Sequence, residues 1–215
     1  MTQANTSNSH THYILNKPYG YLSQFISNDK KEQKKRFLGS LFNFALGTMP
    51  IGRLDEKSEG LLLLTTNSRI STYITTSSVE KEYYVQLDGE ISNLALEEMK
   101  KGVEIGFSGK KYLTKPCKAS KLKEKPIFPK RDKKIRDARH GPTSWVSITL
   151  TEGKFKQVRK MTAAVGFPDL HLYNGPVFQR HPGQSAARTI PPVLQPPTEP
   201  CHHLAVTRSP VPGAG

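Results

Sequence analysis

The chain has 215 residues, enough for one good-sized domain or two small ones. Its 32 lysine and arginine residues outnumber 18 acidic ones, and the resulting net charge of +14 predicts a polyanionic partner bound through counterion release. The composition argues against a disulfide framework, a zinc site and a membrane span, because the two cysteines lie far apart and no apolar run is long enough to cross a bilayer.

The N-terminal part begins with a polar segment. Residues 1–12 are rich in Ser, Thr and Asn, which predicts a disordered tail. Tyr13 to Leu15 then predicts a short strand, and Lys17-Pro18 followed by Gly20 predicts a loop.

An aspartate-containing turn precedes a run of four leucines. Gly52-Arg53-Leu54-Asp55 is followed by Gly60 and then by Leu61 to Leu64. The run is short, so it favours a strand buried on both faces over a helix. Asp55 would then lie in a turn held by a rigid strand, as many reactive side chains do. Aspartate is also common in ordinary turns, so this spacing alone does not make it catalytic.

The middle of the chain predicts a helix, a strand and a second helix. Asn67 or Ser68 is expected to cap the first helix, and Ser92 to start the second. Between them, residues 83–87 are aromatic and β-branched, which is typical of a strand. Tyr83 and Tyr84 should therefore point to opposite faces.

Residues 127–141 form the most basic segment. A loop this charged is not expected to pack into a core, so it is either a solvated insertion or an arm that contacts phosphates, and we favour the arm. Its cations are Lys130, Arg131, Lys133, Lys134, Arg136 and Arg139.

The last predicted elements are a strand, a helix and a tail. Residues 146–150 alternate apolar and polar, and Lys154 to Val165 predicts an amphipathic helix closed by Gly166. Phe155 belongs to the apolar face of that helix. Residues 174–215 contain no lysine and nine of the 16 prolines, which predicts disorder.

Four of these stretches occur in the order of a known family's motifs. Together they resemble the RNA pseudouridine synthases of the small-subunit-rRNA type, over about residues 13–172. Within that family the pattern is most similar to the branch that modifies large-subunit rRNA, synthase E. The four stretches are Leu15–Gly20, Gly52–Asn67, Lys81–Val85 and Glu152–Met161.

The resemblance implies an α+β fold with a central, mostly antiparallel mixed sheet flanked by helices. It implies a catalytic domain over residues 13–173, and we expect no small RNA-binding domain ahead of it. Residues 174–215 depart from the family's pattern and are expected to be a divergent tail.

The resemblance also implies site residues. Asp55 would be the catalytic carboxylate, as a nucleophile or as a base. Arg159 would keep it ionised, or would instead contact a phosphate. Tyr83 would stack on the extruded uracil, although a tyrosine in a strand is more often a core residue. Neither cofactor nor metal is implied. The expected RNA contacts are Arg53, Lys17, Lys81, Lys156, Lys160, Lys130, Arg131, Lys133, Lys134 and Arg136.

The expected function is isomerisation of a uridine to pseudouridine in 23S ribosomal RNA. The alternative is a non-catalytic RNA-binding or ribosome-assembly protein on a degenerate synthase scaffold. A cytoplasmic monomer that binds ribosomal RNA and no membrane is expected in either case.

Overall fold

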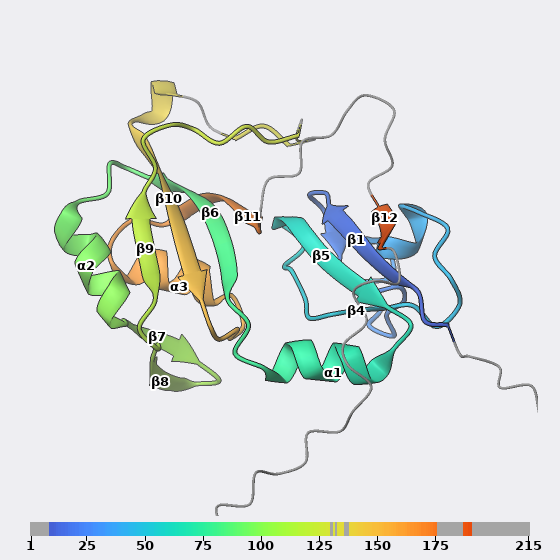
Figure 1. The fold of residues 1–215 in the computed structure, drawn as a ribbon. Coiled ribbons are helices and arrows are strands. Elements are labelled where there is room, and N and C mark those ends of the chain that lie inside the picture. The colour runs from blue at the N-terminus through green and yellow to red at the C-terminus, as the bar shows by residue number, and fades with distance from the viewer. Residues whose placement is uncertain (1–8, 130, 132, 136–137, 176–186, 191–215) are drawn as a thin grey trace, which may run out of the picture.

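The computed structural model describes residues 9–129, 131, 133–135, 138–175 and 187–190. Figure 1 shows a sheet with helices beside it. The strands are β1 His12–Lys17, β2 Tyr21–Leu22, β3 Arg36–Phe37, β4 Met49–Pro50, β5 Glu59–Thr65, β6 Lys81–Asp88, β7 Glu104–Phe107, β8 Lys110–Leu113, β9 Lys118–Lys121, β10 Thr143–Leu150, β11 Asp169–Asn174 and β12 Ala187–Ile190. The α-helices are α1 Ser68–Thr76, α2 Asn93–Lys101 and α3 Gln157–Ala164, and short 3-10 turns cover Leu38–Ser40 and Ala138–His140.

The main sheet has eight strands in the order β12-β1-β5-β11-β6-β10-β9, with β4 paired to β5. All of its pairings are antiparallel except that between β5 and β11. That parallel pairing is short, joining Tyr173 to Glu59 and Asn174 to Gly60. The predicted α+β class and mostly antiparallel sheet are therefore confirmed.

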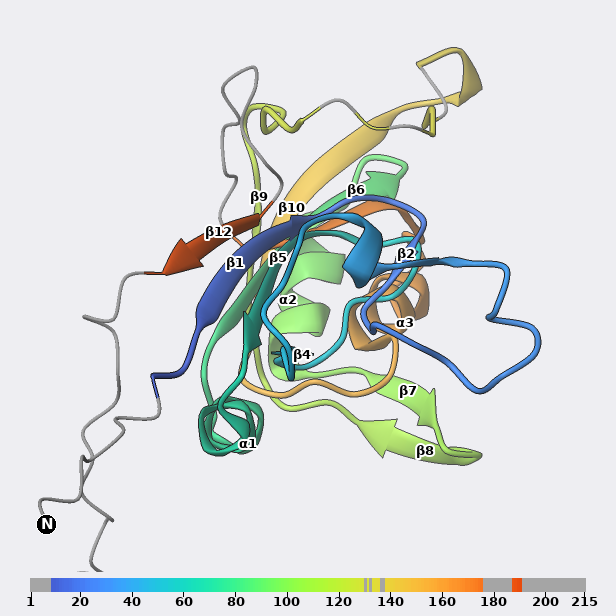
Figure 2. The same ribbon diagram turned by 90° about the vertical axis from the view of Figure 1, so that its right-hand side faces the viewer.

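Two separate hydrophobic cores lie on either side of this short pairing. The larger one packs α2 and α3 against β6, β10 and β11, with Val85, Met99 and Met161 fully buried. The smaller one packs Leu15 and Leu64 against the loop that follows β1. Figure 2 shows α2 and α3 on the same side of the sheet. The two halves of the sheet thus meet along a seam at β5 and β11.

Local sequence accounts for the helix boundaries. The Asn67 side chain accepts hydrogen bonds from the backbone of Arg69 and Ile70, and the Ser92 hydroxyl accepts one from Ala95, as expected of N-caps. None of the helices in the described part of the chain is long and apolar enough to span a membrane.

Two predicted boundaries were wrong. The helix α3 begins at Gln157 rather than Lys154, because Lys156 takes a left-handed conformation with φ 53°. The predicted disorder of residues 174–215 fails at Asn174, which ends β11, and at Ala187–Ile190, which pair with β1. A sheet edge offers unpaired backbone groups to any extended segment, so composition does not predict such pairing. Apart from Gly175, the other residues of that tail lie outside the described part.

Gly60 lets β5 and β11 approach at the seam. Its φ is +110°, and a Cβ at this position would lie 2.3 Å from the carbonyl oxygen of Asn174. We predict that Gly60→Ala lowers the free energy of unfolding by about 1–3 kcal/mol or more. The added Cβ would both strain the backbone at this positive φ and clash with the Asn174 carbonyl. Denaturant unfolding measures this change.

Gly106→Ala is the matched control, because a Cβ on Gly106 would meet nothing within 4 Å and its φ is ordinary. It should change the unfolding free energy little. Equal stability of the two variants would contradict the proposed close approach.

Candidate active site

Asp55 lies in a turn just before β5, and hydrogen bonds fix that turn from both sides. The backbone N–H of Ser58 donates to the Asp55 carbonyl at 3.0 Å. The Ser23 hydroxyl donates to the Leu54 carbonyl at 2.8 Å and accepts from the Leu54 N–H at 3.0 Å. The N–H of Gly20 donates to the Glu56 carbonyl at 2.8 Å. The loop after β1 therefore positions the carboxylate.

Lys17 lies beneath this turn and is fully buried. Its ammonium donates to the carbonyls of Pro18 at 3.0 Å and Tyr21 at 2.8 Å, with a longer contact to Glu56 at 3.5 Å. Burial lowers the pKa of Lys17 to about 8, while the negative charges of Glu59, Asp55 and Glu56 oppose that fall. The expectation that Lys17 contacts RNA was wrong, because its donors are engaged inside the protein.

Arg159, near the start of α3, contacts three side chains with different nitrogens. Its Nε lies 3.3 Å from the Asp55 carboxylate, and one terminal nitrogen donates to the Ser58 hydroxyl at 3.0 Å. The other terminal nitrogen pairs with Asp169 on β11. A guanidinium offers several donors in one plane, so it can serve all three groups at once. Arg159 thus links the Asp55 turn to the opposite side of the seam.

Asp169 adds a second carboxylate to this site. Burial raises its pKa above the usual value and the charge of Asp55 adds to that rise, whereas Arg159 opposes it. The positive charge of Arg159 is therefore shared between two carboxylates that repel each other.

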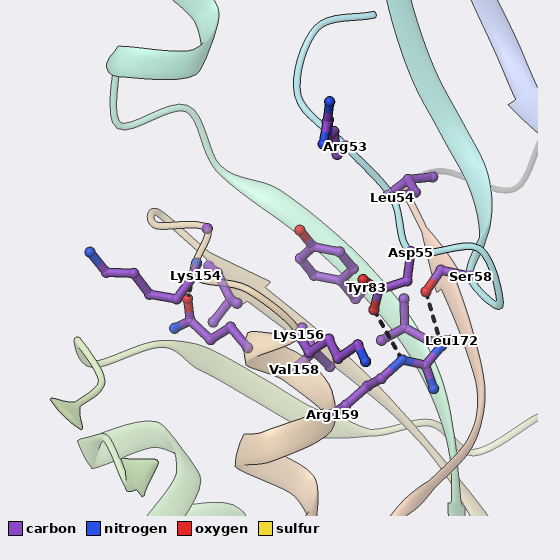
Figure 3. A pocket seen from close by; sticks show the side chains of 13 residues that line it. Arg53, Leu54, Asp55, Ser58, Tyr83, Lys154, Lys156, Val158, Arg159 and Leu172 are labelled. Carbon is purple, nitrogen blue, oxygen red and sulfur yellow. Dashed lines mark hydrogen bonds and ion pairs between the residues drawn. The ribbon is translucent and has the colours of Figure 1, made fainter. Parts of the chain in front are cut away.

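Tyr83 on β6 and the Asp55 turn line one pocket, together with Arg159 and Leu172. The pocket has a volume of about 70 Å³. Burial, with a smaller contribution from the Asp55 charge, raises the pKa of Tyr83 to about 12, so it presents a neutral ring at neutral pH. In Figure 3 the Asp55 carboxylate and the Arg159 guanidinium point toward each other, with the Tyr83 ring alongside.

Arg53 and the loop before α3 complete the lining. Arg53 is exposed, and in Figure 3 it extends away from the Asp55 carboxylate. Lys154 and Lys156 line the opposite wall. The pocket therefore combines a carboxylate, an arginine, an aromatic ring and cationic rims.

The remaining predicted RNA contacts lie outside the pocket lining. Lys81 donates to the Val79 carbonyl at 3.2 Å, and Lys160 donates to the Gly106 carbonyl at 2.6 Å. Lys133 and Lys134 are exposed. Lys130 and Arg136 lie outside the described residues.

Arg131 has a different environment from the one predicted. Its Nε lies 2.7 Å from the carboxylate of Glu59, which also contacts His171 at 2.8 Å. Its guanidinium lies 4.4 Å from the centre of the Tyr19 ring. Phe128, close by in the chain, packs 4.6 Å from Tyr173 between ring centres. No described residue of 127–141 belongs to either hydrophobic core, as expected. Arg131 pairs with Glu59 because that carboxylate is buried and needs a cation, and its contact with RNA stays a prediction.

Ser58 and Asp169 were not predicted as site residues from the sequence. Ser58 follows Asp55 by three positions in the same turn, so turn geometry could have suggested it. Nothing in the local pattern marked Asp169, because only the pairing of β11 brings it to Arg159.

Comparison with known proteins gives one consistent family. The sequence profile described as RNA pseudouridylate synthase matches residues 11–164. The chain is 37% identical over 161 residues to ribosomal large subunit pseudouridine synthase E of Vibrio parahaemolyticus, covering 74% of this chain and 63% of that protein. It is also 37% identical to the protein of the same name in Xanthomonas axonopodis pv. citri, covering 74% of this chain and 81% of that protein.

A solved structure described as a pseudouridylate synthase has a similar fold. The TM-score is 0.63 at 26% identity, covering 85% of this chain and 71% of that one. The fold is that of a pseudouridine synthase domain. The chain belongs to the RNA pseudouridylate synthase family. The matched part spans less than two thirds of the Vibrio relative, at 63% of its length.

The burial of Lys17 generates a prediction about pH. Its pKa is 10.5 ordinarily and about 8 in the folded protein, so between these values the unfolded chain holds a proton that the folded chain has released. Stability must then rise with pH across this window. We predict that the free energy of unfolding of the wild type rises by about 3 kcal/mol relative to that of Lys17→Met between pH 8 and 10.5.

Lys35→Met is a control for which the stability difference from wild type should change with pH in the opposite direction. A hydrogen bond to Glu56 raises the pKa of the partly exposed Lys35, so the wild type should lose stability relative to this variant as pH rises. Urea unfolding at several pH values measures both differences. If the difference in unfolding free energy between wild type and Lys17→Met does not change with pH, the lowered pKa of buried Lys17 is contradicted.

Proposed function

We propose that this chain converts a uridine of large-subunit (23S) ribosomal RNA to pseudouridine, with Asp55 as the catalytic carboxylate. The observation that carries the proposal is the placement of Asp55 against Arg159, 3.3 Å apart, in a pocket that Tyr83 also lines. The naming of two relatives as large-subunit rRNA synthases supports the choice of substrate. We also propose that the protein acts as a monomer in the cytoplasm.

The reaction breaks the N1–C1′ bond and joins C1′ to C5 of the same base. N1 gains a proton and C5 loses one, so no cofactor has to supply atoms or electrons. A carboxylate can start this exchange as a nucleophile or as a base, and both roles need its ionised form. Arg159 favours that form through its positive charge and hydrogen bonding.

The pocket requires the target base to leave its helical stack, because Asp55 cannot reach a stacked base. Tyr83 offers the extruded uracil an uncharged aromatic face. Arg53, exposed at the rim, is placed to occupy the vacated position or to hold the phosphate. Each of these roles uses a side chain that lines the pocket.

The experiment replaces Asp55. We predict that Asp55→Asn abolishes pseudouridine formation in 23S rRNA while retaining RNA binding, because the amide is neither a nucleophile nor a base. Chemical mapping of pseudouridine in rRNA, from cells that lack the gene and carry each variant, measures the outcome.

Glu56→Gln is the matched control, since Glu56 lies in the same turn but pairs with Lys35 at 2.8 Å instead of lining the pocket. It should restore the modification. If Asp55→Asn restores it equally, the catalytic assignment fails. If wild type binds rRNA but never modifies it, the non-catalytic alternative is favoured.

A further inference from the structure

Phe155 is an exposed aromatic side chain beside the pocket. The sequence places it on the apolar face of a helix, yet 64% of its surface is exposed. The cause is the left-handed conformation of Lys156, which delays the helix until Gln157. A non-glycine residue in this region carries backbone strain, and such strain often occurs at functional sites.

Ammonium groups surround this ring and its aromatic neighbours. The Nζ atoms of Lys156 and Lys160 lie 4.9 Å and 5.6 Å from the centre of the Phe155 ring. The Nζ of Lys154 lies 5.3 Å from the centre of the Phe107 ring and 5.1 Å from that of Tyr112. Aromatic faces interleaved with cations are what single-stranded nucleic acid requires, since bases stack and phosphates pair with charge.

The loop that carries Phe155 is braced by a partly buried polar network. Glu152 accepts hydrogen bonds from Tyr112 at 2.6 Å and from Gln157 at 2.6 Å. Gln157 in turn accepts one from the backbone N–H of Lys154 at 2.9 Å. Although burial disfavours its charge, the pKa of Glu152 is lowered because these hydrogen bonds outweigh that effect. The loop therefore presents Phe155 in a preformed arrangement, which reduces the entropy lost on binding.

The position of the loop relates Phe155 to the target nucleotide. Lys154 and Lys156 both line the pocket that contains Asp55, and Phe155 lies between them in the chain. In Figure 3 Lys154 extends outward from that wall, away from Asp55. Phe155 therefore lies at the edge of the pocket that would receive the uridine.

We propose that Phe155, with Lys154, Lys156 and Lys160, forms a subsite for an unpaired nucleotide next to the extruded uridine. The base of that nucleotide stacks on the Phe155 ring, and the lysines contact the flanking phosphates. The inference rests on the proposed function in one respect, which is that the pocket receives a uridine of an RNA strand.

The test compares two probes by fluorescence anisotropy with the full chain. One is a short labelled oligouridylate, and the other is an abasic ribose-phosphate oligomer of the same length and charge. We predict that Phe155→Ala binds the oligouridylate roughly 5- to 100-fold more weakly, the loss of one stacked base, and binds the abasic oligomer as wild type does. Phe155→Tyr should restore the affinity, because it keeps an aromatic face.

Leu94→Ala is the matched control, because Leu94 is a large apolar side chain that is 83% exposed on α2, outside the pocket lining. It should leave both affinities unchanged. Lys156→Ala should weaken the binding of both probes, because it removes a phosphate contact.

The subsite is refuted if Phe155→Ala binds the oligouridylate as wild type does. It is also refuted if the variant loses affinity for both probes equally. The readout needs no turnover, so it separates this inference from the proposed function. A chain that never forms pseudouridine but loses base-dependent binding with Phe155→Ala would refute the function and keep the subsite.

Discussion

The arrangement of the site depends on one guanidinium. Arg159 contacts Asp55, Asp169 and Ser58, which come from both sides of the seam in the sheet. Two carboxylates this close repel each other, and leaving either without its cation in a partly buried site would be costly. The contact therefore ties the halves of the sheet together through charge, at a place where the apolar cores do not meet. It also orients the carboxylate toward the pocket.

The seam itself explains why a pocket can exist in the middle of a sheet. The two cores are separate, and the sheet is continuous between them only through a short parallel pairing. Polar side chains fill the interval: Lys17 under the Asp55 turn, and Glu59 with His171 and Arg131 near the pairing. A buried charge is tolerated when it is paired or hydrogen-bonded, so these groups form an ordered framework around the pocket.

Sequence patterns predicted the parts of this arrangement that are local. The turn before the leucine run, the strand with Tyr83 and the caps at Asn67 and Ser92 follow from short-range periodicity and hydrogen bonding. The approach of Arg159 to Asp55 came from the order of family motifs, because no local rule joins residues that far apart. Asp169 could not be predicted, since its role depends on the register of β11.

The error over Lys17 has a physical cause that also clarifies how the net charge of +14 should be interpreted. A lysine or arginine in a sequence carries the same charge whether it meets a phosphate, a carboxylate or a backbone carbonyl. Lys17 is fully buried with its partners inside the protein, so it contributes to the charge total without being available to RNA, and Arg131 already pairs with Glu59. Lys156 and Lys160 lie beside an aromatic side chain that is 64% exposed, and Lys160 also donates to the Gly106 carbonyl at the surface. Attraction to a polyanion is therefore expected to concentrate where cations and exposed rings occur together, along the rim of the pocket.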